Sequence, residues 1–153
     1  MKKVIILLLG LSVFAACKKD KDAFSSVSFA TVKAKEASFT TDYILVSDAN
    51  GEVLKPGSII FYHTTGGNYG KMIIRNTGFS TNHSLVFDMV TYNPQGTVVK
   101  SVNGLTIAIG ALCDLDLGIQ LNADGTQSFY WSSQSGDTLT PDGTATFYVY
   151  LKK

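Results

Sequence analysis

The amino-acid sequence predicts an all-β protein, a single antiparallel β-sandwich, with a small β-barrel as the alternative architecture. Short runs of Val, Ile, Leu, Phe, Tyr and Thr recur along the 153 residues, separated by Gly, Asn, Asp and Pro. Segments 48–51, 93–96 and 122–125 each begin with Asn or Asp and end with Gly, a pattern typical of hairpin turns. The one helical candidate, residues 31–38, is too short to indicate βαβ units, so we expect antiparallel strands.

The first half of the predicted domain contains several runs of β-branched and aromatic residues bounded by polar turns. These runs predict strands at residues 25–31, 42–46, 58–63, 71–76 and 83–92, with a short piece at 52–55. In the last of the five, Leu85, Phe87 and Met89 alternate with Val86 and Val90, so the strand is apolar on both faces. We therefore expect it to be a central strand of its sheet.

The same pattern in the second half predicts strands at residues 97–102, 105–109, 115–121, 127–131 and 144–151. Asn103-Gly104 separates the first two and is the strongest hairpin signal in the chain. Because side chains alternate along a strand, Phe129 and Trp131 are expected to share one face while Tyr130 points to the other.

The N-terminus has the features of an export signal. Two lysines precede an apolar run at residues 4–16, which ends in small residues before Cys17. The run is shorter than the ~20 apolar residues that a membrane-spanning helix needs. Phe14-Ala15-Ala16-Cys17 resembles the bacterial lipobox, with Phe14 in place of the usual Leu. This resemblance implies a signal peptide at 1–16, a lipidated Cys17 and a membrane anchor.

A cluster of Lys and Asp follows the cysteine at residues 18–22 and resembles the start of Bacteroidota surface lipoproteins. The resemblance implies attachment to the outer membrane facing the exterior, with its inner leaflet as the rival location. Residues 17–24 would form a short charged tether of roughly 23 Å at ~3.3 Å per residue. The folded all-β domain is expected to occupy residues 25–153.

Charge and cysteine content exclude some classes of protein. The full chain has 13 basic and 12 acidic residues, and removal of Lys2 and Lys3 with the signal leaves it close to neutral. Without a basic stripe, nucleic acid is not an expected partner. If Cys17 carries lipid, Cys113 has no intrachain partner, and its apolar neighbours predict a buried, inert thiol.

Asp114-Leu115-Asp116 is the candidate metal site. On a strand these two carboxylates would project from one face, and Ca²⁺ would need further oxygen ligands from loops or Asp137. The pair also has the spacing of an inverting hydrolase, although no glutamate lies near it. The plainer alternative is that both acids are solvated at the end of a strand.

The sequence gives little support for an enzyme. His63 and His83 stand outside any zinc-binding spacing, and no GxSxG nucleophile elbow is present. The glycine-rich segment 66–71 lacks the spacing of a phosphate-binding loop. We therefore expect a non-catalytic protein without an obligatory cofactor.

Aromatic side chains are the candidate ligand contacts, because rings can stack on sugars and also stabilise protein interfaces. Tyr69 is expected at a glycine-rich loop tip, and Tyr130, Trp131, Tyr148 and Tyr150 on strands. With the predicted anchor, they indicate a surface-exposed binding module, most simply for a glycan. The alternative is a structural or protein-interaction lipoprotein of an envelope complex or adhesin-like assembly.

Overall fold

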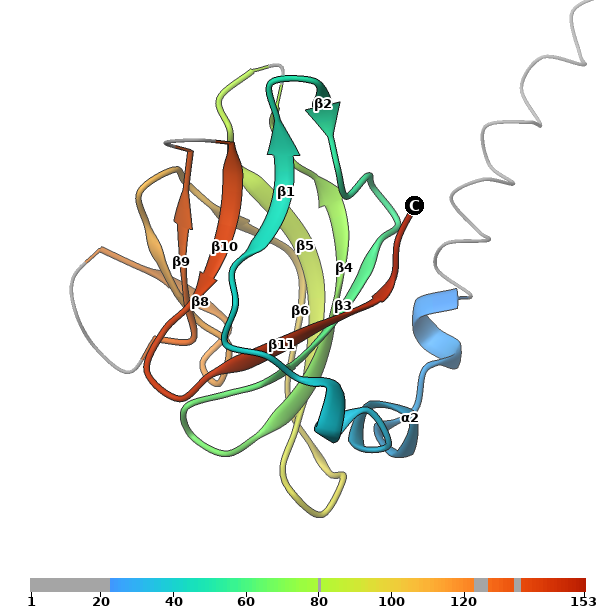
Figure 1. The fold of residues 1–153 in the computed structure, drawn as a ribbon. Helices are drawn as coiled ribbons and strands as arrows, with labels where there is room; N and C mark the ends of the chain where they lie inside the picture. Colours follow the sequence, from blue (N-terminus) through green and yellow to red (C-terminus); the bar gives the residue numbers. More distant parts are fainter. Residues whose placement is uncertain (1–22, 80, 123–126, 134–135) are drawn as a thin grey trace, which may run out of the picture.

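The computed structural model describes residues 23–79, 81–122, 127–133 and 136–153, which fold into a β-sandwich (Figure 1). Two antiparallel sheets face each other and do not close into a barrel within this part of the chain, so the sandwich prediction is confirmed over the barrel. The predicted signal peptide 1–16, Cys17 and most of segment 17–24 lie outside the described residues. No helix in the described ranges has the length and apolarity to cross a membrane.

One sheet contains five strands in the order β11-β3-β4-β5-β6. These strands are β3 (Ile59–His63), β4 (Tyr69–Asn76), β5 (Leu85–Tyr92), β6 (Val98–Ile107) and β11 (Thr146–Leu151). The prediction that residues 83–92 form a central strand is confirmed, because β5 pairs with a strand on each side.

The other sheet contains six strands in the order β2-β1-β10-β9-β7-β8. They are β1 (Ile44–Asp48), β2 (Gly51–Glu52), β7 (Leu112–Asp114), β8 (Ile119–Leu121), β9 (Phe129–Ser132) and β10 (Asp137–Pro141). The sequence did not predict β10, in which Asp and Pro, both poor strand formers, stand at the two ends of a run of only three other residues. It forms because it fills the space between β1 and β9 and pairs with both.

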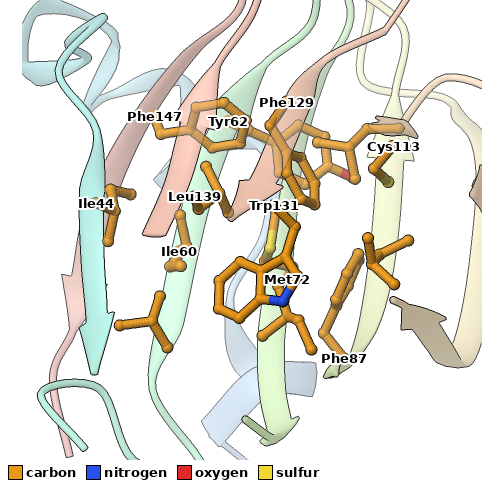
Figure 2. Close-up of a cluster of buried hydrophobic side chains, with 14 of the residues drawn as sticks. Ile44, Ile60, Tyr62, Met72, Phe87, Cys113, Phe129, Trp131, Leu139 and Phe147 are labelled. Carbon is orange, nitrogen blue, oxygen red and sulfur yellow. The ribbon is translucent and has the colours of Figure 1, made fainter. Parts of the chain in front are cut away.

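The main hydrophobic core lies between the sheets (Figure 2). Trp131 and Phe129 point into it from β9 and are fully buried, whereas Tyr130 between them is 38% exposed on the outer surface. The predicted alternation along this strand is therefore confirmed. Cys113 is also buried in this core, as predicted, and burial raises the pKa of its thiol.

A second apolar cluster lies on the outer face of the five-stranded sheet. Val27 and Val32 from the N-terminal segment pack there against Ile59, Phe61 and Ile73. We call residues 23–39 the N-terminal strap. Burial on both faces explains why β3 and the first six residues of β4 are almost continuously buried.

The N-terminal strap is helical, so the predicted strand at residues 25–31 is wrong. Residues 23–26 form a helical turn, followed by α2 (Phe29–Lys33) and the 3₁₀ turn η1 (Glu36–Ser38). Ser28 caps α2, because its hydroxyl accepts a hydrogen bond from the backbone N–H of Thr31 at 3.2 Å. This cap and the packing on the sheet outweigh the β propensity of Val27 and Thr31.

The predicted hairpin at Asn103-Gly104 is also wrong. Residues 98–107 run as one strand, β6, along β5, with a shift of register opposite Asp88. Gly104 has φ +66°, and its N–H donates to the Asp88 carboxylate at 2.8 Å. The pair thus forms an irregularity within a continuous strand, because pairing with the whole of β5 satisfies more backbone groups than a turn would.

The predicted strand at 115–121 is replaced by a turn between two short strands. β7 ends at Asp114, residues 115–118 turn, and β8 begins at Ile119. Gly118 has φ +64°, and a side chain there would collide with Val102 on β6. The turn is therefore fixed by its contact with the neighbouring sheet.

The opposite orientations of Phe129 and Tyr130 give a test of the fold. Phe129→Ala should lower the free energy of unfolding by about 3–5 kcal/mol, because it leaves a cavity in the core. The matched change Tyr130→Ala should cost less than about 1 kcal/mol, as is usual for partly exposed sites. Urea denaturation followed by the fluorescence of the buried Trp131 measures both; equal losses would contradict the described register.

Candidate functional site

A pocket of about 400 Å³ opens at one end of the sandwich. It lies where the end of β1, the segment between β4 and β5, and the start of β10 come together. Loops at the end of a β-sandwich are less restricted than the strands and commonly carry binding residues. The described residues that line it are Ser47, Asp48, Ala49, Phe79, His83, Ser133, Gly136 and Asp137.

A buried carboxylate lies at the base of this pocket. Asp137, the first residue of β10, is 1% exposed and is paired in register with Ser47 of β1. Ser47 Oγ donates to Asp137 Oδ2 at 2.5 Å, and His83 Nδ1 lies 2.9 Å from Oδ1. A buried carboxylate is costly unless both oxygens are hydrogen-bonded, and these two partners meet that need.

The histidine is held by both its backbone and its ring. His83 has φ +54°, the one positive φ at a non-glycine residue among those described. Its carbonyl accepts a hydrogen bond of 2.6 Å from Trp131 Nε1, and the Phe79 ring meets the imidazole edge-on at 6.2 Å. Backbone strain of this kind persists where the surroundings fix it, and it is concentrated at functional sites.

This arrangement presents one nitrogen of the imidazole to a ligand. Nδ1 faces the Asp137 carboxylate and donates to it, so in the neutral imidazole Nε2 is left as a hydrogen-bond acceptor on a side chain that is 41% exposed. The three residues do not form a nucleophilic triad. Ser47 is fully buried and donates to Asp137 rather than to His83, so the imidazole is not placed to act as a base on its hydroxyl.

The structure places Asp114 at the end of β7 and Asp116 in the turn that follows, so the two carboxylates do not project from one strand face. Asp114 Oδ1 accepts from the backbone N–H groups of Asp116 and Leu117 at 2.8 and 3.0 Å. Asp116 Oδ1 accepts from Thr64 Oγ1 at 2.8 Å and from Asn68 Nδ2 at 2.9 Å. Both carboxylates thus hold loops together.

The described residues contain no group of three or more His, Cys, Asp or Glu side chains that could hold a metal ion. Asp137, which the sequence offered as a further calcium ligand, is bonded to Ser47 and His83 instead. The geometry therefore gives no support to a calcium site at Asp114 and Asp116, since that ion needs six to eight oxygens.

Two of the five aromatic residues predicted as ligand contacts are buried. Trp131 is fully buried in the core, so its ring cannot reach a ligand. Tyr69 is 5% exposed and begins β4 rather than occupying a loop tip. Its hydroxyl interacts with Lys33 and Glu36 of the strap, and its ring packs on His63 at 4.5 Å.

The role of the other three tyrosines as ligand contacts remains a prediction. They lie on two separate surfaces. Tyr130 lies on the outer face of the six-stranded sheet, paired with Thr140 and Leu112. Tyr148 and Tyr150 lie on β11, where Tyr150 stacks on Phe61 at 4.3 Å. The five aromatic residues thus do not form one binding face.

His83 stood out in the sequence, but its hydrogen-bond partner Asp137 did not. Asp137 lies 54 residues away on a strand that was not predicted, so no local spacing connects the two residues. The available signal was a histidine in a polar segment, Thr81-Asn82-His83, between two strong strands.

Comparison of the chain with protein-family models, with curated proteins and with solved structures gives no match.

The pairing of His83 with Asp137 fixes a tautomer that can be measured. In its neutral form His83 should carry the proton on Nδ1, because that nitrogen faces the buried carboxylate. Long-range ¹⁵N–¹H correlation spectra of uniformly labelled protein distinguish the two tautomers, with His63 as an internal reference. A neutral His83 protonated on Nε2 would contradict the described site.

Proposed function

We propose that this chain is a lipid-anchored binding protein of the bacterial outer membrane that faces the exterior and holds a glycan without transforming it. The lipobox-like Phe14-Ala15-Ala16-Cys17 and the following Lys/Asp cluster support the anchor and the address. The pocket at His83 supports ligand binding, and it is the single observation on which the binding proposal depends.

The chemistry of the pocket suits a sugar. Its volume of about 400 Å³ is near the lower end of the ~300–1,000 Å³ of small-molecule sites, enough for a short stretch of a glycan. His83 Nε2 and the Asp48 carboxylate can accept hydrogen bonds from hydroxyl groups. The Phe79 ring supplies an apolar surface for the C–H face of a sugar ring.

One observation favours protein interaction as a second candidate function. β6 is an edge strand of ten residues, and Val98 and Val99 on it are 54% and 49% exposed. Edge strands with exposed apolar residues can pair with a strand from another chain. An envelope protein that adds a strand to this edge is the corresponding partner.

The anchor is tested by replacing the predicted lipidated residue. Cys17→Ala should move the protein from the membrane fraction to the soluble fraction, because the acyl chains supply the membrane affinity. Mass spectrometry of the N-terminal peptide should find lipid on Cys17 in the unaltered protein, and protease treatment of intact cells should digest the domain. Cys113→Ala is the matched control and should remain in the membrane.

The pocket is tested with the full-length protein in detergent micelles on a glycan array, followed by calorimetry with the best polysaccharide. His83→Asn should weaken binding at least about tenfold, or ~1.4 kcal/mol, because Asn tolerates positive φ and keeps a donor for Asp137 but removes Nε2. Phe79→Ala should have a similar effect, whereas His63→Asn is the matched control and should not. Binding should be equal in calcium and in chelator.

The other outcomes are informative. Binding that survives His83→Asn but is lost in Tyr130→Ala or Tyr150→Ala would move the site to an outer sheet face. Binding to no glycan on a broad array would overturn the glycan proposal. Cross-linking on intact cells through a photoreactive residue at Val98 would then test the β6 edge.

A further inference from the structure

A buried lysine holds the N-terminal strap on the sheet. Lys71 of β4 is 4% exposed, and its Nζ donates to the carbonyls of Phe24 at 2.6 Å and Val27 at 2.5 Å. The same ammonium lies 4.5 Å from the centre of the Phe24 ring. Burial lowers the pKa of Lys71, and the two carbonyls and the ring replace part of its lost hydration.

The strap has a second attachment at the start of β4. Lys33 Nζ lies 3.9 Å from the centre of the Tyr69 ring, donates to its hydroxyl at 2.5 Å and pairs with Glu36 at 3.0 Å. The ring of Phe29 packs edge-on against Tyr69, with 6.2 Å between the ring centres. On another side the Phe29 ring lies so close to Gly96 that any side chain at position 96 would collide with it. Both ends of α2 are therefore held in place.

The strap covers the part of the sheet that lies away from the pocket. Tyr69 and Lys71 are at the start of β4, whereas the chain reaches the pocket at Phe79, after the other end of this strand. The five steps along the strand from Lys71 to Asn76 alone span about 17 Å at ~3.3 Å per residue. Figure 1 shows the same separation, with α2 at the end of the sandwich opposite the β1–β2 turn.

The docked strap also sets the length of free chain before the fold. Only six residues lie between Cys17 and Phe24, whose carbonyl Lys71 holds, so this connection of seven Cα–Cα steps reaches about 23–25 Å at most. If the strap were released up to Phe39, the connection from Cys17 would be 22 Cα–Cα steps long, with a reach of about 75 Å. Docking therefore shortens the reach about threefold.

We infer that the side of the sandwich covered by the N-terminal strap is its membrane-facing surface, that Lys71 keeps it there by holding the strap on β4, and that the His83 pocket opens away from the bilayer. The partner of this surface is the lipid headgroup layer beside the anchor. The inference rests on the proposed lipidation of Cys17 and adds an orientation to it. It would leave the pocket accessible to ligands from outside the cell.

The test uses the lipidated full-length protein in phosphatidylethanolamine–phosphatidylglycerol vesicles that carry a headgroup quencher. A fluorophore is attached to Ala34→Cys on the strap or to Ala49→Cys at the pocket, both of them exposed alanines. The protein without an added cysteine controls for Cys113, which is buried. Quenching should be several-fold stronger at position 34 than at position 49.

The role of Lys71 is tested by reversing its charge. Lys71→Glu places a carboxylate against two carbonyl oxygens, so the strap should become sensitive to protease and the difference in quenching between positions 34 and 49 should largely disappear. Lys100→Glu on β6 makes the same charge change away from the strap and should preserve both properties. If Lys71→Glu fails to fold, as judged by Trp131 fluorescence, Val32→Asp releases the strap from its own side.

The results separate the two proposals. Absence of lipid on Cys17 in the mass spectrum would overturn the anchor itself. Lipidated protein with equal quenching at positions 34 and 49 would overturn the orientation alone. A strap that stays protected and oriented in both Lys71→Glu and Val32→Asp would show that Lys71 does not hold it.

Discussion

The geometry of the candidate pocket depends on the burial of Trp131. An indole N–H removed from water needs an acceptor, and the carbonyl of His83 provides it. That bond and the Asp137 carboxylate together hold His83 at positive φ, so packing between the sheets determines where a half-exposed imidazole lies. The histidine side of the pocket is thus tied to the core, and this preorganisation of the imidazole would reduce the entropic cost of binding.

The strand framework could be predicted because alternation along a strand is a local property. Phe129, Tyr130 and Trp131 illustrate this, since their orientations follow from the period of two. Asn103-Gly104 shows where local reasoning fails. The pair favours a tight turn in isolation, but β5 is long enough to pair with the residues on both sides of it, and Asp88 accepts the N–H of Gly104. Pairing over the whole strand therefore decides the conformation.

The candidate site was harder to predict than the fold because its contacts join distant parts of the chain. Asp137 is hydrogen-bonded to Ser47, 90 residues away in the sequence, and to His83, 54 residues away. The local sequence around each of these residues gives no sign of its partners. The strap presented the same difficulty. Val27 and Thr31 favour a strand locally, and the partner that holds the strap in its helical form, Lys71, lies more than forty residues away. Long-range hydrogen bonds to buried groups leave no periodic signal in a sequence.

Two buried charged residues, Asp137 and Lys71, each hold a neighbouring segment in one position, at different ends of the molecule. Burial of apolar side chains is non-directional and would permit a loop or strap to settle in several ways. A buried carboxylate or ammonium restricts these choices, because an unsatisfied charge in the interior costs several kcal/mol, roughly 3–5 when one partner of a buried pair is removed. Asp137 thereby selects one position for His83, and Lys71 selects one for the carbonyls of Phe24 and Val27. Each charged residue thus fixes the position of a segment whose own sequence has only a weak conformational preference.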